Sequence, residues 1–126
     1  MFLTIDTTDP RPLYQQVADG IKELIARGTL AEGATLPPVR QLATDLGVNL
    51  NTIATAYRSL QKDGLIVTKH GSGSVVSSRT LTASDPSQLV RPLRTALTHL
   101  VLSGLSPRQI QNIVTRELRL AKKEGT

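Results

Sequence analysis

The feature of this sequence that most constrains its fold is a change in apolar spacing near residue 64. Before it, apolar residues recur every three or four positions in two short stretches that meet at Gly47, as in helices. After it, residues 65–68 and 74–77 have strand-like composition around a glycine-containing turn. Two short helices joined by a tight turn and followed at once by a β-hairpin predict a winged helix-turn-helix, a mainly α fold with a small hairpin wing.

A further helix is expected before this arrangement. Residues 1–9 have an extended pattern, and a helix follows Pro12. It should end at Gly28, because glycine readily adopts the left-handed conformation found at helix ends. Its buried face is predicted from apolar residues spaced three and four apart: Leu13, Val17, Ile21, Leu24 and Ile25.

The helix-turn-helix has its own boundary signals. Pro37 and Pro38 stand at the start of its first helix, since proline suits the first helical turn. Asn49 is a favourable N-cap for the second helix. Tyr57 falls in the apolar stripe of that helix, and we expect its ring in the core and its hydroxyl at the surface.

Residues 80–126 are predicted to form a linker and two further helices, separate from a DNA-binding domain over 1–79. Ser84 or Asp85 caps the first of these helices and Gly104 ends it, and Ser106 with Gln109 forms a capping box for the second. Two helices alone hide only part of their apolar stripes, so we expect the rest to pack on a second copy, or partly on the first helix of the chain. The alternative is a self-contained helical hairpin. The candidate dimer residues are Leu89, Leu93, Leu97, Leu100, Ile110, Ile113 and Val114.

Composition excludes several functional classes. The chain has no cysteine, so a disulfide scaffold, a thiolate metal site and a cysteine nucleophile are ruled out. We expect no membrane span and no signal peptide, and hence a cytoplasmic protein, because apolar runs are short and the first residues lack a basic and an apolar region. Phosphate-binding glycine motifs and catalytic triads are lacking, so we expect no enzyme, no cofactor and no metal ligands.

The net charge of +5 is unevenly distributed. Residues 1–39 carry three basic and five acidic side chains, residues 40–79 five and two, and residues 80–126 seven and three. The predicted DNA-binding domain therefore has a net charge of only +1, so bulk charge is a weak argument for DNA. Two interpretations of the basic tail stand: a solvated rim around a dimer interface, or contacts with flanking phosphates.

Taken in order, several motifs resemble the DNA-binding domain of GntR-type bacterial transcription regulators. They include PLYQQV, VRQLATDLGVN, NTIATAY and HGSGSVV, and the resemblance covers residues 10–76. The tail resembles the YtrA-like branch of that family, which has a short helical pair in place of a full ligand-binding domain. The resemblance implies DNA contacts at Arg40, Asn49, Asn51 and Thr52, and a wing tip at His70 and Gly71 that meets the minor groove.

Helix geometry extends this set of candidate DNA-binding residues. The N-terminal turns of a recognition helix point into the major groove, and a basic residue beside the wing contacts phosphate. The added residues are Leu50, Thr55, Arg58 and Lys69. Three of these residues have an alternative role without DNA. Asn49 is then only a helix cap, Arg58 belongs to a solvated helix face, and His70 is an ordinary loop residue.

Two positions depart from the family pattern. Many members carry arginine where this chain has Leu50 and Ala54, and arginine is the commonest reader of guanine. Leu50 fits a thymine methyl group instead. Specificity would then depend more on Arg40, on Asn49 and Asn51, and on DNA shape.

The function expected from these observations is a homodimeric, sequence-specific bacterial repressor. Its partners would be an inverted-repeat DNA operator, a second copy of the chain and an effector of unknown identity, with no membrane partner. One alternative is an accessory DNA-binding protein of low specificity, which the missing arginines favour. Another is a protein–protein adaptor that uses the winged helix without DNA.

Overall fold

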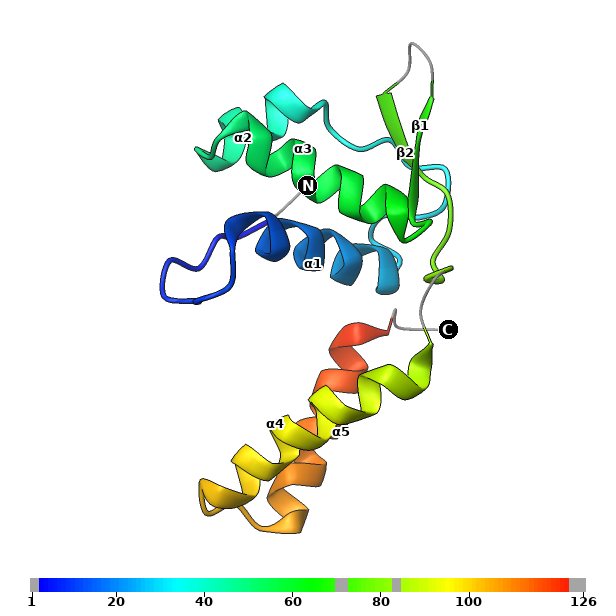
Figure 1. Ribbon diagram of the computed structural model, residues 1–126. Coiled ribbons are helices and arrows are strands. Elements are labelled where there is room, and N and C mark those ends of the chain that lie inside the picture. Colours follow the sequence, from blue (N-terminus) through cyan, green and yellow to red (C-terminus); the bar gives the residue numbers. More distant parts are fainter. Residues whose placement is uncertain (1–2, 70–72, 83–84, 123–126) are drawn as a thin grey trace. The chain divides into compact units, whose positions relative to one another are not determined.

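The chain forms two compact units, Met1–Thr82 and Ala83–Thr126, in a computed structural model that describes residues 3–69, 73–82 and 85–122 (Figure 1). The elements of the first unit are α1 (Leu13–Ala26), α2 (Val39–Leu46), α3 (Leu50–Lys62), β1 (Ile66–Lys69) and β2 (Gly73–Val76). Those of the second unit are the 3-10 helix η1 (Pro86–Leu89), α4 (Val90–Leu102) and α5 (Pro107–Ala121). The predicted fold class, mainly helical with a two-stranded hairpin, is confirmed.

Helix α3 is central to the first unit. It packs against α1, α2 and β1, so its side chains meet apolar residues from all three (Figure 1). The core is almost entirely aliphatic, with Tyr57 as its aromatic member. Its largest fully buried side chains are Ile21, Ile25, Leu36, Leu42, Ile53, Leu60 and Ile66. Burial of this kind stabilises a fold by about 25 cal/mol per Å² of apolar surface.

The apolar stripe of α1 begins one turn later than predicted. Leu13 is 40% exposed, whereas Val17 and Ile21 are buried. Leu3 and Ile5, from the segment before the helix, pack against the core instead. The predicted end of the helix is confirmed, because Gly28 follows with a φ of 80°.

The boundaries of α2 and the hairpin differ slightly from those predicted. Pro38 is extended (ψ 150°) and serves as the N-cap, so both prolines precede α2 instead of lying in its first turn. Strand β1 begins one residue later than expected because the Leu65 N–H donates to the Leu60 carbonyl at 3.0 Å. Leu65 therefore helps to close α3 and does not begin the strand.

The wing is an antiparallel hairpin in which β2 is also paired on the edge that does not face β1. Its register places Ile66 opposite Val76 and Lys69 opposite Gly73. The segment before α2 runs along β2, where Leu36 N–H donates to the Ser74 carbonyl at 2.9 Å. The wing is thus hydrogen-bonded to the segment that leads into α2.

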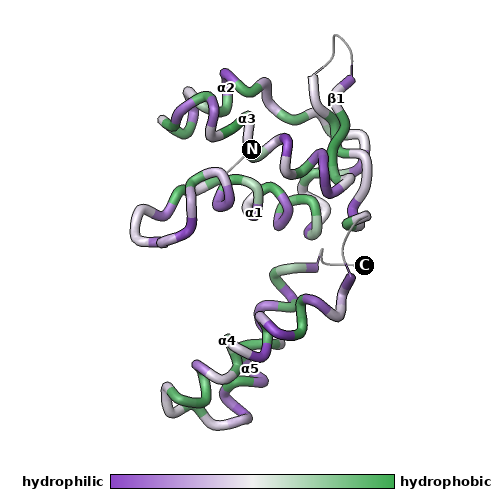
Figure 2. Tube along the Cα trace, viewed as in Figure 1, coloured by the Kyte–Doolittle hydropathy of each residue, from purple (hydrophilic) through white to green (hydrophobic). Residues whose placement is uncertain are grey.

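The second unit is a pair of helices with little interior. Asp85 accepts a hydrogen bond from the Ser87 N–H, and the first turn after this cap is 3-10 instead of α-helical. The predicted capping box of Ser106 and Gln109 is confirmed. Among residues 85–122, only Ile110 is buried, and hydrophobic residues recur along α4 and α5 (Figure 2). No helix in the described ranges is long and apolar enough to cross a membrane.

Candidate nucleic-acid interface

The first turn of α3 combines a helix cap with an exposed polar surface. The Asn49 Oδ1 accepts a hydrogen bond of 2.7 Å from the Asn51 N–H, which confirms the predicted cap. Because the cap uses the carbonyl oxygen of this side chain, its NH₂ group still has two donors. Asn49, Leu50 and Asn51 are all exposed. This turn therefore presents amide donors and one apolar side chain on the surface.

The next turn of α3 pairs two of the predicted residues. Arg58 Nη2 donates to Thr55 Oγ1 at 3.1 Å, three residues apart on one helical face. Arg58 is exposed, whereas Thr52 and Thr55 are half-buried. The contact draws the Arg58 guanidinium back along the helix toward its N-terminal turns.

Tyr57 fixes α3 against the start of α2. Its hydroxyl donates to the Pro37 carbonyl at 2.6 Å, and the residue is only 6% exposed. Burial raises the pKa of Tyr57 to about 12. The predicted position of the ring in the core is confirmed, and the hydroxyl, expected at the surface, is bound by the Pro37 carbonyl.

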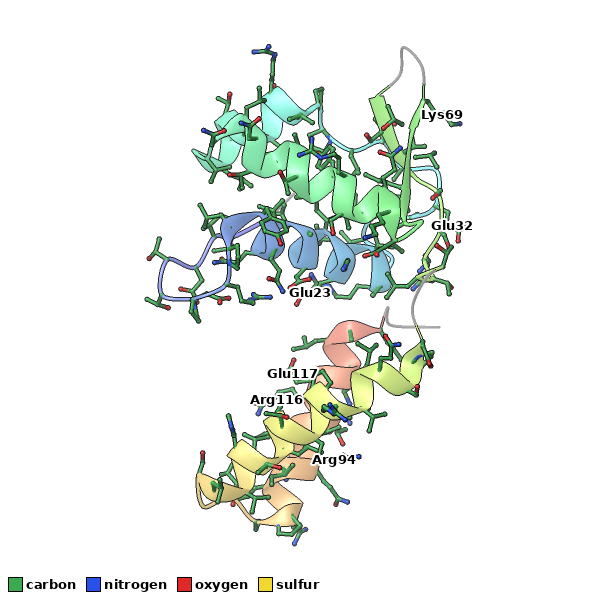
Figure 3. The ribbon with its side chains drawn as sticks, in the orientation of Figure 1. Glu23, Glu32, Lys69, Arg94, Arg116 and Glu117 are labelled. Carbon is green, nitrogen blue, oxygen red and sulfur yellow. The ribbon has the colours of Figure 1, made fainter. Side chains whose placement is uncertain are left out.

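The remaining predicted DNA-binding residues come from other elements. Arg40 is the second residue of α2 and is exposed, and Lys69 is exposed at the end of β1. Figure 3 shows the Lys69 side chain on the outer side of the hairpin. Within the described ranges, neither side chain hydrogen-bonds to the α3 group. His70 and Gly71 lie outside the described residues.

Carboxylates close in sequence to these residues are engaged within the first unit. Asp45 accepts a hydrogen bond of 2.8 Å from Gln41 Nε2, and Asp63 forms an ion pair of 3.1 Å with Lys22. Side chains of the described residues offer no group of three or more potential metal ligands. The exposed surface at α3 is therefore suited to contacts with a polyanion through amides, hydroxyls and cations.

The predicted dimer residues occupy different depths in the isolated chain. Leu89 and Leu93 are more than half exposed, and Val114 is 37% exposed. Leu97, Leu100 and Ile113 are half-buried, and Ile110 lies inside the helical pair at 8% exposure. Further large apolar side chains outside the predicted set are also exposed, namely Val90, Val101, Leu102, Leu118 and Leu120.

Comparison with known proteins places this geometry in a family. Residues 13–76 match the model for bacterial regulatory proteins of the gntR family. The repressor YtrA of Bacillus subtilis is 38% identical over 80 residues, which are 64% of this chain and 62% of YtrA. YhcF of Bacillus subtilis, an uncharacterised transcriptional regulator, is 32% identical over 114 residues, which are 90% of this chain and 84% of YhcF. These relatives are regulators and not enzymes.

Solved structures share the architecture. A transcriptional antiterminator from Listeria monocytogenes EGD-e has a TM-score of 0.82 and 29% identity, covering 96% of this chain and 92% of its own. YtrA from Sulfolobus acidocaldarius, a GntR-family transcription factor, has a TM-score of 0.63 and 38% identity. The match covers 76% of this chain and 97% of the YtrA chain. The AraR DNA-binding domain in complex with operator ORE1 has a TM-score of 0.52 and 26% identity. The match covers 61% of this chain and 94% of the AraR chain.

Proposed function

The chain belongs to the GntR family of bacterial regulatory proteins and is similar to its YtrA-like members, and from this premise we propose that it is a homodimeric repressor of transcription. It binds an inverted-repeat DNA operator in the cytoplasm, with α3 in the major groove and the wing at the minor groove. The observation that carries the proposal is the first turn of α3, where Asn49, Leu50 and Asn51 are exposed while Ile53 on the opposite face is fully buried.

Seven of the candidate residues have a defined task in this proposal. Asn51 and Thr52 meet base edges, because the N-terminal turns of a recognition helix reach the floor of the groove. Leu50 contacts a thymine methyl group, the apolar contact that the major groove offers. Arg40 contributes to specificity together with Asn51, while Asn49, Arg58 and Lys69 contact phosphates and hold the helix in register.

The second unit supplies the dimer contact. Leu89, Leu93 and Val114 are exposed in the single chain, and a unit of this size does not form an adequate core alone. A second copy covers these side chains, and a two-fold pairing presents two first units to two operator half-sites. The same pairing explains why a first unit with little net charge is sufficient for tight binding.

Selection of duplexes from a random-sequence library tests the proposal with the full chain. We expect enrichment of an inverted repeat, followed by binding in anisotropy titrations whose affinity falls with salt. Asn51→Ala and Arg40→Ala should each weaken binding by roughly 1–3 kcal/mol. Gln61→Ala is the matched control, because Gln61 is an exposed amide near the other end of α3. Unchanged affinity in both test variants would refute the assignment of α3.

An accessory protein of low specificity is the second candidate, since Leu50 and Ala54 supply no guanidinium to read guanine from this helix. Titration of the selected duplex against scrambled competitor separates the two. A specificity ratio near one supports the accessory protein, whereas a repressor should exceed about a thousandfold.

A further inference from the structure

The chain leaves the wing along the C-terminal ends of α1 and α3. Residues 78–82, which we call the exit segment, follow β2 and belong to the first unit (Figure 1). Arg79 donates from Nε to the Ile25 carbonyl at 3.2 Å and from Nη2 to the Ala26 carbonyl at 2.5 Å. Thr82 donates from both its N–H and its Oγ1 to the Asp63 carbonyl, each at 3.0 Å. Residues 80–82 lie in the stretch that the sequence predicts as a linker.

Two of the three carbonyls, those of Ala26 and Asp63, are groups that a helix end leaves without internal partners, whereas the Ile25 carbonyl also accepts from the Gly28 N–H at 3.0 Å. The last carbonyls of a helix lack internal donors and carry partial negative charge, so a guanidinium at the end of α1 is favourable. Leu81 between the two anchors packs against the core. At Gly64, φ is 80° and an added Cβ would lie 2.4 Å from Thr82 Oγ1, so the close approach requires glycine.

The exit segment determines how much chain joins the two units. Two residues separate Thr82 from Asp85, the cap of η1, and three peptide steps span at most about 11 Å. Ser77 is held independently, because its N–H donates to the Leu65 carbonyl at 2.8 Å. If residues 78–82 were released, eight steps from Ser77 to Asp85 would span up to about 29 Å.

We propose that Arg79 and Thr82 are positioning residues that set the spacing of operator half-sites. By holding the exit segment on the first unit, they keep the covalent connection to the dimerising second unit short. This inference rests on the proposed dimeric function. Neither residue needs to touch DNA, because each acts on the length of chain available between a DNA-binding unit and its partner contact.

A longer connection has a calculable effect. The effective concentration of a tethered second site falls as about the −3/2 power of connector length, so eight steps in place of three lower it roughly fourfold. A longer connection also tolerates more half-site separations. Releasing the exit segment should therefore weaken binding at the preferred spacing and flatten the dependence on spacing.

The experiment uses the full chain and duplexes carrying the selected half-sites at separations that differ by single base pairs. We compare wild type, the double variant Arg79→Ala/Thr82→Val and the control Lys22→Ala. The control removes the ion pair between Lys22 and Asp63 at the same ends of α1 and α3 but leaves the exit segment anchored. Protection of the residue 82 amide from hydrogen exchange, compared between the proteins, reports release of the segment independently of DNA.

We expect the double variant to lose roughly fourfold in affinity at the preferred spacing, with a flatter profile and weaker exchange protection at residue 82. Lys22→Ala should keep the wild-type profile. A double variant with faster exchange and an unchanged profile overturns the role of the exit segment and leaves the proposed function intact. Unchanged exchange overturns the idea that the side chains of Arg79 and Thr82 hold the exit segment in place. A wild type without any spacing preference refutes two-site binding itself, and this inference with it.

Discussion

The two units of this chain solve the problem of burying apolar surface in opposite ways. The first encloses an aliphatic core around α3, with Ile21, Ile53 and Leu60 fully buried. The second has well-formed helix caps, yet Ile110 is its only buried residue within 85–122. Local helix signals and a hydrophobic core are therefore separable properties. A segment that has the first without the second needs another surface to complete it.

This difference in burial fits the functions proposed for the two units. A DNA-binding unit must hold its recognition helix in one orientation before it meets DNA, and a complete core provides that. A dimerising unit gains most from apolar surface that stays uncovered until a partner arrives, because the binding free energy comes from that surface. If the two units differ in this way, the same kind of change should have different effects in each.

Separating the two units should give the largest effect. We expect residues 1–82 to unfold cooperatively at a midpoint independent of protein concentration, and residues 83–126 to lack stable structure when dilute. Loss of the second unit should weaken binding to a two-site operator by about a hundredfold or more, because avidity is lost. Circular dichroism and anisotropy measure the two parts. A residue 1–82 fragment that remains dimeric would show that the dimer contact lies elsewhere.

Truncating one apolar side chain in each unit sharpens the comparison. Ile53→Ala should lower the free energy of unfolding of the first unit by about 2–5 kcal/mol, since a fully buried side chain leaves a cavity. Leu118 is 57% exposed in the single chain, so Leu118→Ala should change the unfolding of a monomer by only about 0.5 kcal/mol or less.

The dimer supplies the second measurement for that pair. If a second copy covers Leu118, Leu118→Ala should raise the dimer dissociation constant in analytical ultracentrifugation, while Ile53→Ala leaves it unchanged. The opposite pattern would contradict the assignment of dimerisation to the second unit.

The hydroxyl of Tyr57 tests how the first unit orients its recognition helix. Tyr57→Phe keeps the ring but leaves the Pro37 carbonyl without its donor, so we expect a loss of about 1–3 kcal/mol in unfolding free energy. Urea denaturation measures the loss. Tyr14→Phe is the matched control, because Tyr14 is 39% exposed on α1. Equal stability of the two variants would mean that the buried hydroxyl contributes nothing.

The same residue gives the first unit a dependence on high pH. The folded pKa of Tyr57, about 12, lies above the ordinary value of 10, so folding favours the neutral hydroxyl. Its stabilisation is complete below pH 10 and is lost as the pH rises from 10 toward 12. Urea titrations over that range should show the decline in wild type and a smaller decline in Tyr57→Phe.

The sequence predicted those parts of the molecule that depend on local patterns. Period, proline and glycine signals located the helices and the hairpin to within a residue or two, and the Asn49 cap is a short-range hydrogen bond. Contacts between residues far apart in sequence were missed. The bond from Tyr57 spans 20 positions and that from Arg79 to Ile25 spans 54. No periodicity encodes such pairs, because only the tertiary fold brings them together.

Two of the side-chain caps, one in each unit, have effects of about 1 kcal/mol per site, and they separate the units most sharply. Asn49→Ala and Ser106→Ala each remove a cap worth about 1 kcal/mol. In the first unit the loss should lower the free energy of unfolding by about 1 kcal/mol, measured in the absence of DNA. If the second unit folds only on pairing, both copies of Ser106→Ala contribute to one equilibrium. The free energy of dimerisation then becomes about 2 kcal/mol less favourable, which raises the dimer dissociation constant roughly thirtyfold. An unchanged dissociation constant would show instead that α4 and α5 form a stable hairpin before they meet a partner.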